Sequence, residues 1–519
     1  MKKIVYVPLD ERPCNYQYPL DLAGMTDVRL VAPGLEMLGD KKEAADVGRL
    51  AEWLKEAATD ADYVLASIDM LAYGGIVPSR LHGWTPEQCA SRLQLLRELK
   101  KQRPELRIFA FNLIMRAPAY SSSEEEPDYY AEYGRELYDY GRLGDKEERG
   151  ALAGDEAAEL ENLQHRIPPE VLADFLGRRR TNASINEMAI DLANEGAIDF
   201  LIIPLDDNSP YGYTSADQRR LAAKVERLGL YDRVHIYPGA DEIGCTLFAR
   251  MFGEIKGFVP QFRVRFSSTL GPSCVPKYED RTLNESIKAH ITAAGGIIAD
   301  SADAPDIYLM VHSPAVSQID MAETTDPYDR RHRSYFSEIN LREFVQAIRH
   351  YASHGRLIAL ADVSLCNGGD DSLMSTLGKA GLLNDISCYA AWNTSGNSLG
   401  TVISHAVIEA YLRDLSGHAN TEVVGDARQK SRQYYAYRLL EDWGYQAVVR
   451  QNICDNELKA LGGEYFNLAH VQKEVESVIQ DKLEQFSKMR LSGLGNFEVS
   501  DVRLPWRRMF EVGFRLKIN

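Results

Sequence analysis

Two adjacent carboxylates follow one of the most apolar runs of the chain. The run FLIIPL at residues 200–205 is followed directly by Asp206, Asp207 and Asn208. A pair of carboxyls can divide acid–base labour, because one transfers a proton while the other orients a reacting amide or stabilises charge. Neighbours in an extended chain point to opposite faces, so both reach one pocket only where the strand has already turned. The alternative is that Asp207 or Asn208 caps the next helix, with Ser215 as a rival cap.

A second acidic pair follows the run RVHIYPG. Asp241 and Glu242 come after its Pro-Gly turn, where acidic residues at a helix start would favour the helix dipole. If they are functional, they complete a four-carboxylate cluster with Asp206 and Asp207. Two carboxyls flanking a bond are the usual equipment for glycoside cleavage, and a carboxylate cluster also suits a hard divalent metal. We take these four residues as the candidate catalytic residues.

Polar side chains follow most of the other apolar runs as well. Ligands of parallel α/β proteins bind outside the carboxyl ends of the strands, so these positions rank above polar residues elsewhere. Each one alone has a structural explanation, because Asp and Asn cap helices and form turns. Arg80 is a further cleft candidate. The candidate substrate-binding residues are Asp10, Glu11, Arg12, Asp69, Tyr73, Asn112, Arg116, Asn208, Asn393 and Asn397.

The elements that must position these residues are short apolar, β-branched runs that alternate with helical patterns. Ten such runs occur, and runs that are apolar on both faces belong mostly to parallel sheets covered on both sides. The strand–helix alternation predicts repeated βαβ units. Helices are predicted at residues 44–58, 86–101, 183–196 and 340–353, with Asn340 capping the last of them.

The predicted fold class is α/β, with mostly parallel sheets and a barrel-like or Rossmann-like N-terminal part. We place a boundary near GEIKGFVPQF, which gives an N-terminal α/β catalytic domain at 1–259 and a second, smaller α/β domain at 260–415. The remaining residues, 416–519, form a helical C-terminal region with a closing strand, and the whole of 405–490 reads as helical. Residues 120–180 are predicted to be a helical insertion. One continuous barrel from eight of the ten strands is the alternative.

Composition restricts the partners and the location. The chain has 519 residues, a net charge of −17 and a pI of about 5.2, so it has no attraction to phosphate backbones or anionic lipid. The N-terminal apolar run stops at Asp10, before the apolar region of a signal peptide could form. The seven cysteines are scattered and include no CxxC pair, which indicates reduced thiols. We therefore expect a cytoplasmic protein that binds neither nucleic acid nor membrane.

Motifs that would indicate a cofactor do not occur. The sequence has no GxGxxG after a strand, no Walker loop, no HExxH and no GxSxG, and the eleven histidines show no ligand spacing. We expect no cofactor and assign no metal ligands. The expected partner is a small-molecule substrate, a sugar, while assembly into a homo-oligomer stays open.

Five motifs together carry a family resemblance. VPLDERPCN, SIDMLAYGGIVPSR, PLDDNSPYG, PGADEIG and AAWNTSGNSLGT resemble a bacterial family known as domain-of-unknown-function family 4127. The resemblance covers most of the chain and implies no particular activity.

Two local resemblances add to it. Residues 357–380 are similar to the strand, glycine turn and helix of the microcystinase C-like metallopeptidase family, with Asp362, Gly368, Gly369 and Asp371 at the matching positions. The zinc-binding histidines of that family are not evident. The adjacent aspartates after residue 205 resemble those of β-N-acetylhexosaminidases with substrate assistance, which implies that one orients the acetamido group and the other acts as acid.

The function that these residues favour is that of a carbohydrate-active hydrolase that uses strand-end carboxylates as acid and base, with N-acetylhexosaminides as candidate substrates. One alternative is a metal-assisted hydrolase of amide or phosphate bonds, which a chelator would inactivate. Another is a non-catalytic, two-lobed binding protein for small molecules.

Overall fold

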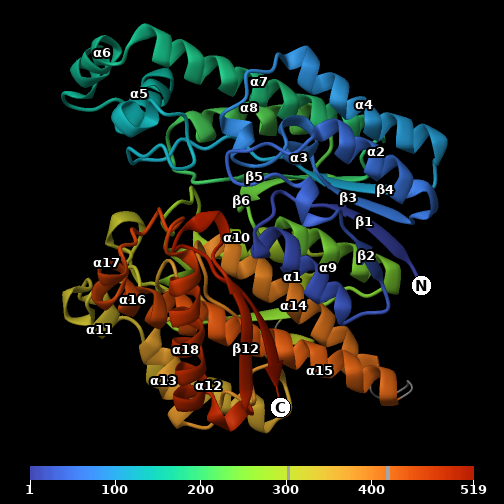
Figure 1. Ribbon diagram of the computed structural model, residues 1–519, viewed down its shortest axis with the longest axis vertical. Helices are drawn as coiled ribbons and strands as arrows, with labels where there is room; N and C mark the ends of the chain where they lie inside the picture. Colours follow the sequence, from blue (N-terminus) through green and yellow to red (C-terminus); the bar gives the residue numbers. More distant parts are fainter. Residues whose placement is uncertain (301–303, 416–420, 519) are drawn as a thin grey trace. The chain divides into compact units, whose positions relative to one another are not determined.

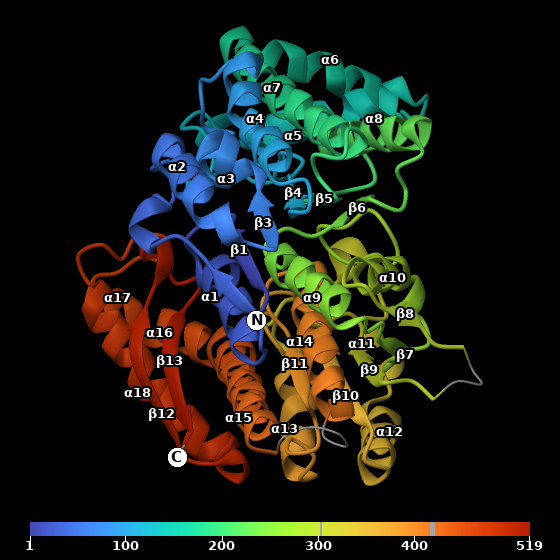
Figure 2. The same cartoon turned by 90° about the vertical axis from the view of Figure 1, so that its right-hand side faces the viewer.

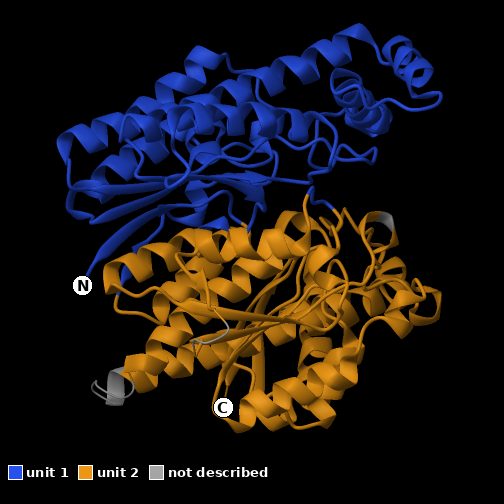
Figure 3. Ribbon diagram, turned by 180° about the vertical axis from the view of Figure 1, so that it is seen from behind, with its two compact units in different colours: residues 1–11, 28–244, 278–280 blue, residues 12–27, 245–277, 281–519 orange. Residues whose placement is uncertain are grey.

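The structure is a computed structural model that describes residues 1–300, 304–415 and 421–518 (Figure 1). Its contacts divide the chain into two compact units, each built around one parallel sheet (Figure 3). The first unit comprises Met1–Glu11, Val28–Gly244 and Tyr278–Asp280, and the second Arg12–Asp27, Cys245–Lys277 and Arg281–Asn519. The predicted α/β class with parallel sheets and a helical C-terminal region is confirmed.

The sheet of the first unit has six parallel strands in the order β2-β1-β3-β4-β5-β6. The strands are β1 (Lys3–Val7), β2 (Arg29–Val31), β3 (Tyr63–Ser67), β4 (Arg107–Phe111), β5 (Phe200–Leu205) and β6 (Val234–Pro238). β3 and β5 are buried along their whole length, which explains their unbroken apolar sequences. The strand order reverses between β1 and β3, and ligands bind preferentially at such a switch point.

The helices of the first unit lie along one face of this sheet (Figure 3). They are α2 (Val47–Ala57), α3 (Ile68–Tyr73), α4 (Pro86–Gln102), α5 (Tyr130–Glu148), α6 (Glu156–Arg166), α7 (Pro169–Asn194) and α8 (Tyr213–Leu228). Thr85 and Gln88 form a capping box at the start of α4, as the Thr-Pro sequence suggests. The predicted helical insertion consists of α5, α6 and the first half of α7, which share a small core around Tyr130 and Phe175.

The sheet of the second unit has five parallel strands in the order β11-β10-β9-β7-β8. They are β7 (Gln261–Phe266), β8 (Ile297–Ile298), β9 (Ile307–His312), β10 (Leu357–Asp362) and β11 (Cys388–Ala390). All ten predicted strands are present, and β8 is an additional short one. Counted from β7, this order repeats that of the first five strands of the first unit, so a second switch point lies between β7 and β9.

The second unit is rich in helices. They are α1 (Pro13–Gly24), α9 (Ile243–Lys256), α10 (Leu283–Ala293), α11 (Ser334–Ser337), α12 (Leu341–Ser353), α13 (Asp371–Lys379), α14 (Ser395–Leu415), α15 (Thr421–Arg438), α16 (Arg450–Asn456), α17 (Leu458–Leu461) and α18 (Gln472–Arg490), together with a π-helix η7 (Leu439–Val449). The long, almost wholly buried α14 packs on β10, β11 and α10 (Figure 2). Asn340 caps α12 as predicted.

Several expectations need correction. The barrel alternative is wrong, because β6 and β7 belong to different sheets. The unit boundary falls at Gly244, and residues 12–27 join the second unit, whereas the sequence suggested a division at 259. The predicted domain bounds 1–259, 260–415 and 416–519 therefore differ from the compact units. The last of these segments shares a unit with the second sheet.

Of two C-terminal predictions, the continuous helical region differs from the structure and the closing strand is present. The predicted helical region 405–490 is interrupted after Gly462, and its residues 416–420 lie outside the described part. The predicted closing strand is β13 (Gly513–Ile518), which pairs antiparallel with β12 (Phe497–Arg503). In the described ranges no helix is long and apolar enough to cross a membrane. All seven cysteines are free thiols, six of them buried.

Candidate functional site

The carboxyl end of the first sheet gathers most of the predicted site residues. Because its strands are all parallel, residues that follow them lie along one edge. The residues that follow β1, β3, β4, β5 and β6 are Asp10, Asp69, Asn112, Asp206 and Asp241, in that order. All but Asp206 are buried as whole residues.

Asp206 and Asp207 both face buried arginines. Asp206 Oδ2 lies 2.8 Å from Nη2 of Arg80, and Asp207 Oδ2 lies 3.0 Å from Nη1 of Arg116. Asp207 has a φ of 42°, a left-handed conformation that non-glycine residues adopt rarely and that is concentrated at functional sites. The strand has therefore turned at Asp207, which is the condition under which two adjacent carboxyls can serve one site.

Two glutamates from the segment before α5 complete the arrangement. Glu125 Oε2 lies 3.0 Å from Nη1 of Arg80 and 3.0 Å from Nη2 of Arg116. Glu126 Oε1 accepts a 2.8 Å hydrogen bond from Nε of Arg116 and lies 3.4 Å from Nη1 of Arg80. We call the six residues Arg80, Arg116, Glu125, Glu126, Asp206 and Asp207 the arginine–carboxyl cluster.

The charges of this cluster do not balance. Two guanidinium groups face four carboxyls, so two negative charges lack a counter-charge when all are ionised. Burial raises the pKa of Asp207 to about 7, and the charge of Asp206 adds to this effect against the attraction of Arg116. Burial also raises the pKa of Glu126, whose Oε2 has no hydrogen-bond partner among the described residues. Asp207 therefore retains its proton near neutral pH, and water reaches its side chain, which is 17% exposed.

Asp69 and Asn112 form a separate hydrogen-bonded chain. Asp69 Oδ2 accepts hydrogen bonds from the backbone N–H of Leu113 at 2.9 Å and from Nδ2 of Asn112 at 3.2 Å. Asn112 Oδ1 in turn accepts a 2.7 Å hydrogen bond from Nδ2 of Asn186 on α7. Burial raises the pKa of Asp69 to about 6. This chain ties α3, β4 and α7 together behind the strand ends.

The other predicted residues of the first unit have local contacts. Glu242 Oε2 accepts a 2.9 Å hydrogen bond from the N–H of Ala240, so it stabilises its own turn. Tyr73 is buried and stacks on His82 with ring centroids 4.6 Å apart. Glu11 accepts a hydrogen bond from the N–H of Lys41.

Three predicted substrate-binding residues belong to the second unit. Arg12 forms an ion pair of 3.2 Å with Glu511 and stacks on Trp506 with its guanidinium carbon 4.4 Å from the ring centroid. Asn393 and Asn397 flank the start of α14, and Asn393 has a left-handed φ of 52°. Asn208, which stays in the first unit, accepts a 2.8 Å hydrogen bond from the N–H of Ser209 through its side-chain oxygen. Roles in substrate binding for these residues stay predictions.

The sequence analysis missed Glu125, Glu126 and Asn186. The glutamates stand in the run SSSEEEPD, inside the predicted helical insertion at residues 120–180, where no site residue was expected. Asn186 lies inside a helical pattern, where nothing distinguishes it from a solvent-facing residue. The one available signal was the run of three consecutive acidic residues close in sequence to Arg116.

The second unit holds a hydrogen-bonded Ser–His–Asp chain that the sequence analysis also missed. It lies at the switch point, because Ser267 follows β7 and His312 ends β9. Ser267 Oγ accepts a 3.0 Å hydrogen bond from the N–H of Ser313 and lies 2.9 Å from Nδ1 of His312. His312 Nε2 lies 3.1 Å from Asp370 Oδ2. A neutral His312 with its proton on Nε2 satisfies every contact, since the Ser267 hydroxyl then donates to Nδ1.

The protonation of His312 depends on two nearby carboxyls. Burial lowers the pKa of His312, but its hydrogen bond to Asp370 and the charge of Asp362 outweigh burial and raise it above 6.5. Asp362 Oδ2 accepts a 2.8 Å hydrogen bond from the N–H of Asp370, in the glycine turn that leads into α13. Over the described residues, no group of three or more His, Cys, Asp or Glu side chains is arranged to hold a metal ion.

Comparison with known proteins gives a family. Residues 4–515 match the family described as "Protein of unknown function (DUF4127)", and the chain belongs to this family. No curated protein matches. Among solved structures, the chain is similar to "The Structure of a C2-type Ketoreductase from a Modular Polyketide Synthase", with 16% identity and a TM-score of 0.14. The match covers 69% of this chain and 90% of that one.

Proposed function

We propose that the protein is a carbohydrate-active hydrolase in which Asp207 donates the proton and Asp206 acts as its ionised partner. The observation that carries the proposal is the buried Asp207 beside Asp206, with a pKa raised to about 7 at the carboxyl edge of a parallel sheet. A carboxyl of this kind keeps its proton near neutral pH and can pass it to a leaving group.

The arrangement suits the cleavage of a glycosidic bond. Asp207 would protonate the leaving oxygen as the bond to the anomeric carbon breaks. Asp206, which Arg80 holds at 2.8 Å, would stabilise the positive charge that develops on the sugar ring or orient an acetamido group. Water then adds its hydroxyl to the anomeric carbon, and its remaining proton restores the carboxyl of Asp207.

A panel of chromogenic glycosides, including N-acetylhexosaminides, tests this proposal. Asp206→Asn and Asp207→Asn should each lower kcat by roughly 100- to 10,000-fold on any glycoside that the protein hydrolyses. Asp62→Asn is the matched control, because Asp62 precedes β3 at the opposite edge of the same sheet. Activity should fall as pH rises through about 7, where Asp207 loses its proton.

Either of two results would contradict the proposal. One is the absence of hydrolysis over the whole panel, and the other is normal turnover by both aspartate variants. Complete loss of activity with a chelator, restored by added metal, would favour a metal-assisted hydrolase instead.

A second candidate function rests on the Ser267–His312–Asp370 chain. It has the hydrogen-bond order of a serine nucleophile, its base and the carboxylate that orients the base, although Nδ1 faces the serine here. We propose acyl-bond hydrolysis at Ser267 as the alternative activity. A fluorophosphonate probe should label Ser267, and Ser267→Ala should abolish labelling. The absence of labelling in the native protein would reject it.

A further inference from the structure

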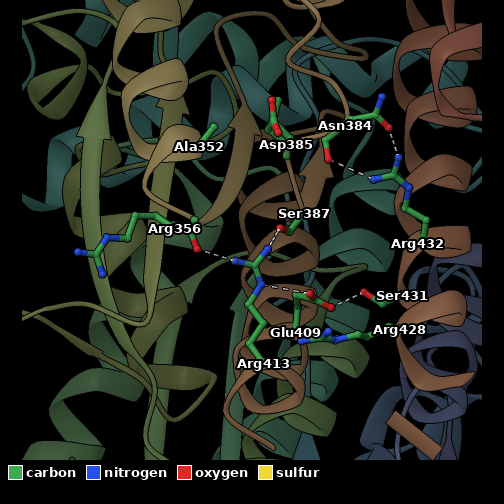
Figure 4. Close-up of a pocket in the computed structure, with 12 residues that line it drawn as sticks. Ala352, Arg356, Asn384, Asp385, Ser387, Glu409, Arg413, Arg428, Ser431 and Arg432 are labelled. Carbon is green, nitrogen blue, oxygen red and sulfur yellow. Dashed lines mark hydrogen bonds and ion pairs between the residues drawn. The ribbon is translucent and has the colours of Figure 1, made fainter. Parts of the chain in front are cut away.

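A cavity of about 550 Å³ opens beside the second sheet, away from the carboxyl ends of its strands (Figure 4). Arg356 and Ser387, which line it, directly precede β10 and β11, so the cavity lies at the amino ends of these strands. The last turns of α14 and the middle of α15 provide the remaining wall. It is therefore distinct from the Ser267–His312–Asp370 chain, which lies at the carboxyl ends of the same sheet.

The lining of this cavity is strongly basic. It includes four arginines and two acidic residues, in a chain whose net charge is −17. The four arginines are Arg356, Arg413, Arg428 and Arg432. The acidic residues are Asp385, which is exposed, and Glu409.

Glu409, the less exposed of the two acidic residues that line the cavity, is already engaged. Glu409 Oε1 lies 3.4 Å from Nε of Arg413, and its Oε2 accepts a 2.8 Å hydrogen bond from the hydroxyl of Ser431. Arg413 also donates a 2.8 Å hydrogen bond to Ser387 Oγ, which fixes its guanidinium toward the cavity (Figure 4). Glu409 therefore has little capacity left to neutralise the other arginines.

Three guanidinium groups have no ion pair within the described part of the chain. Arg432 donates only to the backbone and side-chain oxygens of Asn384, which are uncharged. Arg356 and Arg428 have neither a side-chain hydrogen bond nor an ion pair with any described residue, but the side chain of Arg356 is directed away from the other cavity arginines (Figure 4). Arginines gathered around one cavity without counter-charges repel each other, and a bound anion would relieve that repulsion.

We propose that this cavity binds a phosphate-bearing small molecule. Guanidinium groups recognise phosphate through paired, charge-assisted hydrogen bonds. The hydroxyls of Ser387 and Ser431 and the amide of Asn384 can hydrogen-bond the neutral part of such a ligand. The volume lies within the range of small-ligand sites, which is about 300–1,000 Å³. The inference is independent of the proposed hydrolase, because no residue of this cavity belongs to the arginine–carboxyl cluster.

Calorimetry on the full chain tests the proposal with three probes: inorganic phosphate, glucose 6-phosphate and glucose. The two phosphate compounds should bind and glucose should not. Added salt should weaken the binding of both. Arg432→Gln and Arg428→Gln should each weaken binding about tenfold, since a hydrogen bond to a charged group is lost.

Arg342→Gln is the matched control and should bind as the native protein does. Arg342 is an exposed arginine at the start of α12, at the opposite end of that helix from the cavity. Arg428 is exposed and forms no ion pair with a described residue, so its replacement should leave the far-ultraviolet circular dichroism unchanged. The proposal is overturned if neither phosphate compound binds, or if the cavity variants bind as tightly as Arg342→Gln.

Discussion

Replacing Asp207 by Asn should raise the free energy of unfolding above that of the native chain, and this gain should be larger at alkaline pH than at acidic pH. The pKa of Asp207 is about 7 in the folded state and about 3.8 in the unfolded chain. A raised folded pKa contributes stability that is fully present below pH 3.8 and is lost as pH rises through about 7. Asn imitates the protonated carboxyl at every pH and also tolerates the left-handed backbone at this position.

The magnitude follows from the interval between the two pKa values. Between about pH 5 and pH 7 the folded state holds close to one more proton than the unfolded state, which changes stability by about 1.36 kcal/mol per pH unit. The limit is therefore roughly 3 kcal/mol. The side chain remains 17% exposed, so water screens part of the effect, and we expect about 2 kcal/mol.

Urea unfolding of both proteins at about pH 5 and about pH 8.5 measures this difference. Asp62→Asn is the control, because burial raises the pKa of Asp62 but the hydrogen bonds from Lys2 and Lys3 outweigh burial and lower it. Its stabilisation is lost only as pH falls below about 3.8, so the effect of that variant should be equal at both pH values. An equal effect of Asp207→Asn at both pH values would refute the reasoning and reduce Asp207 to a partner of Arg116.

Three further outcomes are expected. His312→Asn should lower the free energy of unfolding more at about pH 6 than at about pH 9. The pKa of His312 is raised in the folded state, so protonated His312 stabilises the fold below 6.5, and this stabilisation is lost as pH rises. Asn186→Ala should lower the free energy of unfolding in urea by about 1–3 kcal/mol, since it leaves the buried Asn112 Oδ1 without its donor. Gly74→Ala should lower the melting temperature, because Gly74 has a φ of 87° and a Cβ there would lie 2.8 Å from the backbone nitrogen of Ala45.

Much of the architecture was predictable from the sequence, because strands buried on both faces leave an unbroken apolar signal. All ten predicted strands exist, and FLIIPL and IYLMV are both wholly buried. The unit boundary was not predictable in the same way. Residues 12–27 form α1, which packs against α14 and α15 of the second unit, and this long-range contact leaves no local pattern in the sequence. The interruption after Gly462 was missed because the apolar periodicity continues on both sides of it.

The sequence predicted where the site lies, at the carboxyl ends of the parallel strands, but it did not predict the role of each residue there. Polar residues after parallel strands must meet at one edge, and that rule located Asp69, Asn112 and Asp206 together. The rule does not predict which side chains from other segments contact these residues. Arg116, the charged partner of Asp207, is itself held by Glu125 and Glu126, which only the folding of the segment before α5 brings to it.

The carboxyls of Asp69 and Asp207 differ in how many hydrogen bonds they accept and in how far water reaches them. Asp69 directs one oxygen to both Leu113 and Asn112 and is 3% exposed, so its carboxyl is committed to holding the strand ends. Asp207 has one charged partner, a raised pKa and contact with water. A group that must give up and regain a proton needs that access, whereas a group that holds an element in place is better served by burial and several donors. On this criterion Asp207, and not Asp69, is the carboxyl to which we assign the proposed acid–base role.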